Sequence, residues 1–203
     1  MNGKQQRIGL LGGSFDPVHN GHLAAARVAM AFGGLDRVIF IPAAVSPFKQ
    51  TQAQASGAHR LEMLRLATAS ESQMCVSDVE IVQSGVSYTI DTVRHFLAEL
   101  PEAKLFFILG ADALVTLHAW HEAHALVELC DFITLARSGS VVGTLPGFSA
   151  ATSQRLLNGV IRDFKVHVSS TDVRQRVAAG ASITDSVHPD VACYIAEHGL
   201  YRS

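Results

Sequence analysis

The fold is decided by a stretch near the amino terminus that reads Ile8-Gly9-Leu10-Leu11-Gly12-Gly13-Ser14-Phe15-Asp16-Pro17-Val18-His19-Asn20-Gly21-His22. A short apolar run ends at two adjacent glycines, and a helix-like segment begins near His22. A strand that passes through a glycine turn into a helix is typical of a βαβ unit. The glycines also let a ligand approach the backbone closely, because no Cβ intrudes.

The same alternation of strand-like and helix-like segments continues along the chain. Nearly continuous apolar runs predict parallel strands covered on both faces, at Ile8–Leu11, Val38–Ile41, Leu105–Leu109 and Phe132–Leu135, with weaker candidates at Met74–Val76 and Lys165–Val168. Helices are expected at 22–32, 59–69, 89–100, 113–117, 123–129, 153–160, 171–179 and 191–197, and loops at 42–57 and 138–149. We therefore expect an α/β fold, a doubly wound open parallel sheet with a small C-terminal helical portion, in a single domain over residues 1–203.

Composition and charge exclude several classes of protein. The 203 residues are 48% hydrophobic with a formal net charge of −2, which excludes a disordered chain and argues against a nucleic-acid-binding surface. Cys75, Cys130 and Cys193 lie far apart, and no apolar run approaches the ~20 residues that cross a bilayer. We expect a cytoplasmic protein with reduced thiols and no membrane partner. The sequence leaves a homo-oligomer open.

The helix that follows the two glycines is expected to bind an anion. The start of a helix presents unpaired N–H groups and the positive end of the helix dipole, both suited to phosphate. His19 and His22 are three residues apart, so both imidazoles can project toward the same anion. The stretch lacks the Gly-x-Gly-x-x-Gly pattern of dinucleotide-binding oxidoreductases and the Gly-Lys-Ser/Thr of a Walker loop, which disfavours both classes.

A second segment with helix-start character stands near the C-terminus and reads Val168-Ser169-Ser170-Thr171-Asp172-Val173-Arg174. It follows the last strand candidate and opens a helix that Ser170 or Thr171 could cap. Taken alone, a helix cap is the simpler interpretation. In a doubly wound sheet the loops that follow strands meet at the carboxyl edge, so we expect Gly12–Ser14 and Ser169–Thr171 to converge.

These two segments resemble the two signatures of the nucleotidyltransferases with an HxGH motif. Over its full length the chain further resembles the bacterial nicotinate-nucleotide adenylyltransferases, which join ATP to nicotinate mononucleotide. Six further segments carry that resemblance: the stretch from Pro42 through Pro47-Phe48-Lys49, His59-Arg60-x-x-Met63, Ser87-Tyr88-Thr89, Gly110-Ala111-Asp112, Trp120 and Gly199-Leu200-Tyr201-Arg202. Two positions depart from the family pattern, Phe48 for a histidine and His121 for a common tyrosine, and they bear on loop closure and pyridine packing.

The resemblance implies a Rossmann-like nucleotidyltransferase fold and a direct in-line attack of the mononucleotide phosphate on the α-phosphorus of ATP, with no covalent enzyme intermediate. A phosphate oxygen is already ionised at neutral pH, so catalysis needs positioning and charge stabilisation and no protein nucleophile. Mg²⁺ is expected as cofactor, bound mainly through ATP phosphates and water, with no metal ligands assigned to the protein. ATP and nicotinate mononucleotide are the expected partners, without nucleic acid.

The resemblance also implies roles for individual residues. The implied catalytic residues are His19, His22, Arg174 and Lys49, with His22 donating to the α-phosphate and Arg174 holding the β- and γ-phosphates. ATP binding is implied for Gly12, Gly13, Ser14, Phe15, His19, His22, Gly110, Asp112, Ser169, Ser170, Thr171 and Arg174. Mononucleotide binding is implied for Ser14, Lys49, Thr89, Asp112, Trp120, His121 and Arg137. Trp120 would stack on the pyridine, the backbones of Thr89 and His121 would bind the carboxylate, and Asp112 would bind ribose.

Several alternatives stay open. A sister enzyme would keep the chemistry but use nicotinamide mononucleotide or pantetheine phosphate, or transfer a cytidylyl group. A non-catalytic nucleotide-binding sensor is expected to lack His19, His22 or Arg174, and all three are present. Trp120 would, in a simpler interpretation, only cover a hydrophobic edge. The triple His118, His121 and His124 drifts around a helix, so solvated side chains are expected there in preference to zinc.

Overall fold

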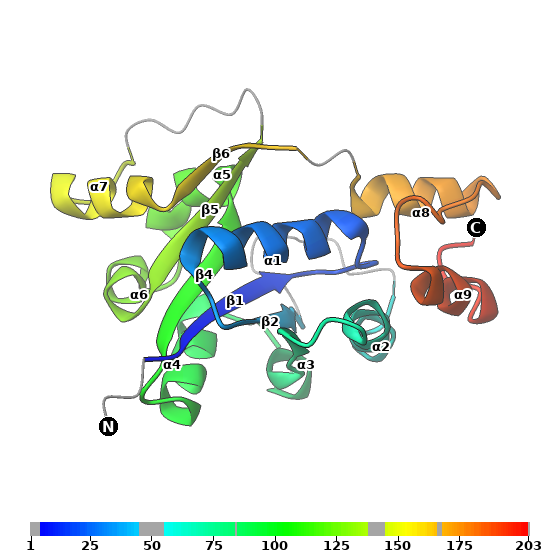
Figure 1. Cartoon of the computed structure of the whole chain (residues 1–203), viewed down its shortest axis with the longest axis horizontal. Helices are drawn as coiled ribbons and strands as arrows, with labels where there is room; N and C mark the ends of the chain where they lie inside the picture. The colour runs from blue at the N-terminus through cyan, green and yellow to red at the C-terminus, as the bar shows by residue number, and fades with distance from the viewer. Residues whose placement is uncertain (1–4, 45–54, 84, 138–144, 166–167, 203) are drawn as a thin grey trace. The chain divides into compact units, whose positions relative to one another are not determined.

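The computed structural model describes residues 5–44, 55–83, 85–137, 145–165 and 168–202 (Figure 1). The strands are β1 (Arg7–Gly13), β2 (Arg37–Pro42), β3 (Met74–Val76), β4 (Lys104–Gly110), β5 (Asp131–Arg137) and β6 (Val160–Phe164). The helices are α1 (Asn20–Gly33), α2 (Gly57–Thr68), α3 (Val79–Gln83), α4 (Thr89–Glu99), α5 (Ala111–Val115), the 3₁₀ turn η1 (Leu117–Ala119), α6 (Ala123–Leu129), α7 (Ala150–Asn158), α8 (Ser170–Ala178) and α9 (Pro189–Glu197).

The strands form one six-stranded sheet in the order β3-β2-β1-β4-β5-β6. β1 pairs in parallel with β4, β4 with β5, and β5 with β6, and Figure 1 shows β1, β4 and β5 side by side. The chain therefore winds outward in one direction through β2 and β3, then returns beside β1 and winds the other way. This confirms the predicted doubly wound parallel sheet, whose ligands are expected where the strand order reverses, between β1 and β4.

Contacts within the chain divide it into two compact units that interleave in sequence. Unit 1 comprises Met1–Gly12, Ala26–Ile39 and Tyr88–Lys165, and unit 2 comprises Gly13–Ala25, Phe40–Ser87 and Val166–Ser203. The single domain over residues 1–203 that the sequence suggests stays a prediction.

Unit 1 contains the middle of the sheet and the helices that follow it. Every residue of β4 from Leu105 to Leu109 is buried, as expected of a parallel strand covered on both faces. α4 buries Ile90, Val93 and Phe96, which recur every three residues and share one helix face. Each such side chain contributes about 1.5–3 kcal/mol when fully buried, so this face fixes α4 in place.

Unit 2 contains the loop after β1, the end of β2 and the C-terminal helices. Met63 and Leu64 of α2 are fully buried, and α2 packs on α9, which buries Val191 and Ile195. α8 and α9, coloured orange to red in Figure 1, form the predicted C-terminal helical portion. Within residues 168–202 the structure contains no strand.

The position of the last strand differs from the sequence prediction. It runs from Val160 to Phe164, where the sequence predicted the end of a helix at residue 160. The weaker strand candidate at Lys165–Val168 lies partly outside the described residues, which exclude 166 and 167. The preceding helix ends at Asn158, and its C-cap Gly159 lies so close to β5 that a Cβ there would overlap the carbonyl oxygen of Phe132. Gly159 therefore turns the chain into the sheet five residues early. The short helix α3 was not predicted at all.

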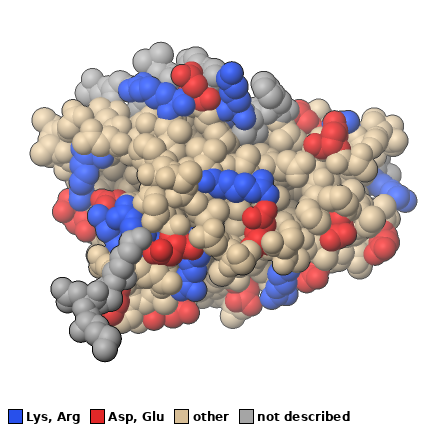
Figure 2. Space-filling view, in the orientation of Figure 1, with Lys and Arg blue, Asp and Glu red and all other residues tan. Residues whose placement is uncertain are grey.

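Two predicted loops lie largely outside the described residues, at 45–54 and 138–144. In the part of the chain that is described, no helix combines the length and apolar character needed to span a bilayer. On the face that Figure 2 presents, basic and acidic side chains are interspersed, in keeping with the formal net charge of −2.

Candidate active site

The loop that follows β1 is held in an unusual backbone conformation by buried groups. Phe15 has a φ of +47°, and its side chain is only 2% exposed, with its ring 5.7 Å from that of Phe40. A Cβ at Gly13 would lie 3.0 Å from the Phe15 ring, so a side chain at that position would disturb the packing. Any contact of Phe15 with a nucleotide therefore has to come through its backbone.

His19 and His22 come together at the start of α1. Their rings stack with centroids 3.7 Å apart and planes 21° apart, and His19 is buried. The His19 backbone N–H donates to Nδ1 of His22 over 3.2 Å. A neutral imidazole carries one proton, so this bond leaves the proton on Nε2 of His22 and makes that atom a donor. The Phe15 ring meets His22 edge-on, at 4.9 Å between centroids, and restrains its orientation.

The serine-rich segment near the C-terminus packs against this same loop, in unit 2. Ser170 Oγ donates to the carbonyl oxygen of Pro17 over 2.9 Å, and Nη1 of Arg174 donates to that of Asp16 over 2.7 Å. These two bonds join residues that are 153 and 158 positions apart in sequence, and they bring the C-terminal segment against Asp16 and Pro17 of the loop. The predicted convergence of Gly12–Ser14 with Ser169–Thr171 stays a prediction.

The helix cap in this segment differs from the prediction. The residue that caps α8 is Ser169, whose Oγ accepts from the backbone N–H of Asp172, whereas Ser170 or Thr171 was expected. The hydroxyl of Thr171 instead accepts from Nη2 of Arg174 over 3.4 Å. Ser170 lies one residue inside the helix, which frees its hydroxyl to fasten α8 to the loop after β1.

Arg60 joins the loops that follow β1 and β2. Its side chain is 3% exposed, and Nη1 donates to the carbonyl oxygens of Ser14 and Ala43 over 2.7 and 2.8 Å. Burial lowers the pKa of Arg60 from its ordinary value, and the carboxylate of Asp16 partly opposes this. A buried guanidinium bound to two carbonyls fixes the distance between the two loops.

Asp16 is a buried residue of the loop after β1, and two other segments of unit 2 donate hydrogen bonds to it. Its Oδ1 accepts from the backbone N–H of Ala55 over 3.1 Å and from the Tyr201 hydroxyl over 2.7 Å. Burial, together with the hydrogen bond to Asp16, raises the pKa of the Tyr201 hydroxyl well above its ordinary value. Tyr201 is therefore a neutral donor that ties the C-terminal tail to the β1 loop.

The remaining strand-end residues lie in unit 1. Gly12, Gly110 and Arg137 stand at or near the carboxyl ends of β1, β4 and β5, which the parallel pairing brings to the same edge of the sheet. Gly110 precedes α5, and Asp112 lies exposed in the first turn of that helix. A Cβ at Gly110 would meet no atom within 4 Å, so the backbone there is open to a ligand.

His121 contacts the start of α4, while its neighbour Trp120 contacts β4. Thr89 is the first residue of that helix, and the ring of the preceding Tyr88 lies 4.3 Å from the His121 ring. Trp120 is half-buried and meets the ring of Phe107 edge-on at 6.0 Å between centroids. The indole therefore does cover part of the core, while the exposed His121 is turned to the helix start.

A bidentate ion pair fastens the loop that contains His121 to α4. Nη1 and Nη2 of Arg94 donate to Oε1 and Oε2 of Glu122 over 3.1 and 2.7 Å. The hydrogen bond from Arg94 is the largest cause of the lowered pKa of Glu122, and the same bond raises the pKa of Arg94. Glu122 has a φ of +49° and precedes α6 without a side-chain cap.

The three histidines of this region have separate neighbours. His121 faces Tyr88, the ring of His124 lies 5.4 Å from that of Phe148, and His118 lies against Gly147. Among the described residues no cluster of three His, Cys, Asp or Glu side chains could hold a metal ion. That zinc is not bound here stays a prediction.

Comparison with known proteins identifies the family. Residues 10–176 match the cytidylyltransferase-like family. A relative from Neisseria meningitidis serogroup B, named "Probable nicotinate-nucleotide adenylyltransferase", is 40% identical over 201 residues, covering 97% of this chain and 99% of its own. A relative of the same name from Citrifermentans bemidjiense is 40% identical over 215 residues, covering 96% and 98%. The chain belongs to the nicotinate-nucleotide adenylyltransferase family.

Solved structures of this family have the same fold. The Plasmodium falciparum nicotinic acid mononucleotide adenylyltransferase complexed with NaAD superposes with a TM-score of 0.75 at 20% identity, covering 97% of both chains. The same protein complexed with APC gives a TM-score of 0.74, again at 20% identity and 97% coverage of both chains. The Rossmann-like nucleotidyltransferase fold expected from the sequence is thereby confirmed.

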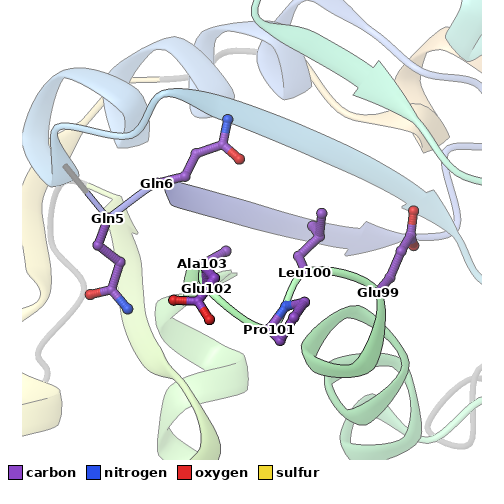
Figure 3. A pocket seen from close by; sticks show the side chains of 7 residues that line it. All are labelled: Gln5, Gln6, Glu99, Leu100, Pro101, Glu102 and Ala103. Carbon is purple, nitrogen blue, oxygen red and sulfur yellow. The ribbon is translucent and has the colours of Figure 1, made fainter. Parts of the chain in front are cut away.

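One described pocket lies away from the predicted site of this nucleotidyltransferase. It encloses about 670 Å³ and is lined by Gln5, Gln6, Glu99, Leu100, Pro101, Glu102 and Ala103 (Figure 3). These residues precede β1 and β4, at the amino ends of both strands. Parallel sheets bind ligands at the opposite, carboxyl edge, so the pocket does not belong to the nucleotide site.

The sequence pointed to Arg60 and Tyr201 only as marks of the family, and it gave Asp16 and Arg94 no role. For Glu122 it favoured a solvated or capping role, and the structure shows that this side chain does not cap α6. A signal for Arg60 existed, because Arg60, Met63, Leu64 and Ala67 follow the i, i+3, i+4, i+7 spacing of a buried helix face. A charged residue on such a face must find partners within the protein. Of the predicted site residues, Lys49 lies outside the described part of the chain.

Proposed function

We propose that this nicotinate-nucleotide adenylyltransferase transfers the adenylyl group of ATP to nicotinate mononucleotide, giving nicotinate adenine dinucleotide and pyrophosphate for NAD biosynthesis. A phosphate oxygen of the mononucleotide attacks the α-phosphorus, the bond to the bridging oxygen breaks, and pyrophosphate leaves. The observation that supports this most strongly is the hydrogen bond from His19 N–H to Nδ1 of His22, which leaves Nε2 as a donor.

The phosphates of ATP are proposed to bind the unit 2 cluster. Nε2 of His22 would donate to the α-phosphate, where charge builds up as the reaction proceeds, so its hydrogen bond strengthens in the transition state. His19 and Arg174 would hold the other phosphates, because guanidinium and imidazole donors match phosphate oxygens. The start of α8 adds backbone N–H groups, while Gly12, Gly13, Ser14 and Phe15 would contact ATP through their backbone.

The mononucleotide is proposed to bind the unit 1 residues. Trp120 would stack on the pyridine ring, and the backbone N–H groups of Thr89 and His121 would donate to the nicotinate carboxylate. Asp112 would accept from ribose hydroxyls, and Arg137 would contact the phosphate. Lys49 would close over the phosphates.

Mg²⁺ is proposed to accompany ATP. The side chains assigned to the phosphates, His19, His22 and Arg174, are nitrogen donors, and Oδ1 of Asp16 already accepts two hydrogen bonds. This set suits phosphate better than a hard cation, which prefers oxygen ligands. Mg²⁺ would therefore be held by ATP phosphates and water, and would neutralise charge on the departing pyrophosphate. A cytoplasmic location and a homo-oligomer stay predictions.

The function is tested by offering one preparation a panel of substrates. The protein is incubated with ATP and Mg²⁺ and with nicotinate mononucleotide, nicotinamide mononucleotide or pantetheine phosphate, and pyrophosphate release and the joined product are measured. CTP replaces ATP in a parallel series. We expect kcat/KM for the acid to exceed that for the amide by about 10- to 100-fold, because the amide leaves carboxylate-binding donors unsatisfied. A ratio of the two kcat/KM values near one would contradict the assignment of nicotinate mononucleotide as the substrate, but it would not contradict adenylyl transfer.

A further inference from the structure

The loop of residues 120–122 contacts two points six residues apart in sequence: Tyr88, the N-cap of α4, and Arg94 within that helix. At the helix start, the Tyr88 and His121 rings lie 4.3 Å apart at an angle of 34°. Farther along, Nη1 and Nη2 of Arg94 donate to Oε1 and Oε2 of Glu122 over 3.1 and 2.7 Å. His121 and the residue that follows it are thus both held against the helix whose first residue is Thr89.

The backbone of this loop needs an external restraint. Glu122 adopts the left-handed conformation, with φ +49° and ψ +40°, which residues with a Cβ rarely occupy without support. Glu122 also occupies the N-cap position of α6, yet its side chain does not cap that helix. Its carboxylate reaches α4 instead. A planar guanidinium that binds both carboxylate oxygens fixes orientation as well as distance, unlike a single hydrogen bond.

We propose that the Arg94–Glu122 pair is a positioning device that determines acceptor specificity: it sets the His121 backbone N–H at the spacing from α4 at which one carboxylate is bound. The inference rests on the proposed function, in which the N–H groups of Thr89 and His121 bind the nicotinate carboxylate. Neither Arg94 nor Glu122 touches the substrate in this scheme. Their effect is on preference for the acid over the amide, because two donors at a fixed spacing match two carboxylate oxygens.

Asp91 and His121 offer alternative charged or polar partners to Arg94 and Glu122. Asp91 Oδ1 lies 3.7 Å from Nη1 of Arg94, and Nε2 of His121 lies 3.5 Å from Oε1 of Glu122. Both distances are longer than the direct bonds. Loss of Glu122 would therefore leave Arg94 with Asp91, on the same helix, and would release the loop. Arg94 and Glu122 side chains are 47% and 42% exposed, so their loss is not expected to unfold the protein.

The experiment compares kcat/KM for nicotinate and nicotinamide mononucleotides in wild type, Arg94→Met and Glu122→Gln. We expect Arg94→Met to lower the ratio of kcat/KM for the acid to kcat/KM for the amide about tenfold. An exposed ion pair contributes little to stability. Misplacing a substrate can cost ~100-fold in rate, and the expected effect is smaller because the loop is released only in part. Glu122→Gln keeps a hydrogen bond to Arg94 and should lose less. KM for ATP and the melting temperature should stay unchanged in both variants.

Arg65→Met is the matched control. Arg65 is an exposed arginine of α2, and its partner is Glu62, 3.6 Å away on the same helix. It removes the same charge, so any change in the ratio that it shares with Arg94→Met is a net-charge effect. The exchange variant Arg94→Glu/Glu122→Arg restores an ion pair with reversed polarity, and should recover most of the acid preference.

The outcomes separate the inference from the function on which it rests. An Arg94→Met variant that keeps the wild-type ratio, or that lowers activity on acid and amide equally, would overturn the positioning role. So would an exchange variant no better than Arg94→Met alone. A wild-type ratio near one would instead overturn the nicotinate assignment, and is measured in the same assay before any variant is compared.

Discussion

The loop after β1 and the loop after η1 are held in place by opposite means. In the first, the buried carboxylate of Asp16 accepts from Ala55 and from Tyr201 near the end of the chain, and the buried guanidinium of Arg60 donates to the carbonyl oxygen of Ser14. In the second, the ion pair of Arg94 and Glu122 is nearly half exposed on both sides. Both loops contain a non-glycine residue with positive φ, so both need restraint, but only the first is restrained by burial.

This difference follows from what each loop is proposed to do. A donor that stabilises charge on a transferring phosphoryl group must be fixed before the reaction, because reorganising it would cost energy at that moment. Buried, multiply bonded groups satisfy that requirement. A loop that admits a second substrate has to reach solvent, and an exposed ion pair can restrain it without closing it. We therefore expect substitutions in the β1 loop to change stability or kcat, and those in the η1 loop to change KM or selectivity.

The largest effect is expected for His22→Ala. Removing one donor to charge that develops in the transition state typically costs about 10²–10³-fold in kcat. Steady-state kinetics with both substrates would show kcat falling far more than the affinity for ATP. His95→Ala, at an exposed histidine of α4, serves as the control and should be active. A near-normal kcat for His22→Ala would show that His22 only supports the loop.

Arg60→Met should lower the free energy of unfolding by about 2–4 kcal/mol, because two buried carbonyl oxygens lose a charged donor. Chemical denaturation measures this directly. Arg65→Met is the matched control, with the same change on the same helix. The Arg65 side chain is exposed and pairs with Glu62 over 3.6 Å, so this variant should lose less than about 0.5 kcal/mol. Equal losses for the two variants would show that burial at Arg60 does not fasten the loops.

The sequence predicted what depends on local pattern. The strand Leu105–Leu109 and the turn at Gly12 and Gly13 were found because hydrophobic periodicity and glycine spacing are visible within a few residues. The sequence misplaced the last strand, because the close approach of Gly159 to Phe132 involves a neighbouring strand and leaves no local pattern.

Partners distant in sequence could not be predicted. Tyr201 and Asp16 are 185 residues apart, and Arg94 and Glu122 are 28 apart, with no periodic pattern that links either pair. Only the folded chain brings them together. The candidate site was accordingly found as a set of nucleotide-contacting residues, while the groups that hold those residues in place were not.

Trp120→Ala separates recognition from packing in the η1 loop. Loss of a stacking surface costs about 1–3 kcal/mol, so KM for nicotinate mononucleotide should rise while KM for ATP stays nearly constant. Trp120→Phe retains an aromatic ring and should keep most of the affinity. The contact with Phe107 predicts some loss of stability as well. A variant that melts early but has a normal KM when folded would show that Trp120 only covers the core.

The smallest effect is expected for Tyr201→Phe, which removes one hydroxyl and leaves the ring. The lost hydrogen bond to the Asp16 carboxylate should lower the free energy of unfolding by about 1.5 kcal/mol at neutral pH. The raised pKa of Tyr201 gives this loss a pH dependence. Because the unfolded chain releases the Tyr201 proton near pH 10 and the folded chain holds it, wild type loses stability as the pH rises above about 10. The variant has no proton to release at this position. The difference between the two proteins, measured by urea denaturation from pH 7 to 11, should therefore shrink at the alkaline end. A difference that is absent at pH 7, or constant across the range, would mean that Tyr201 does not donate to Asp16.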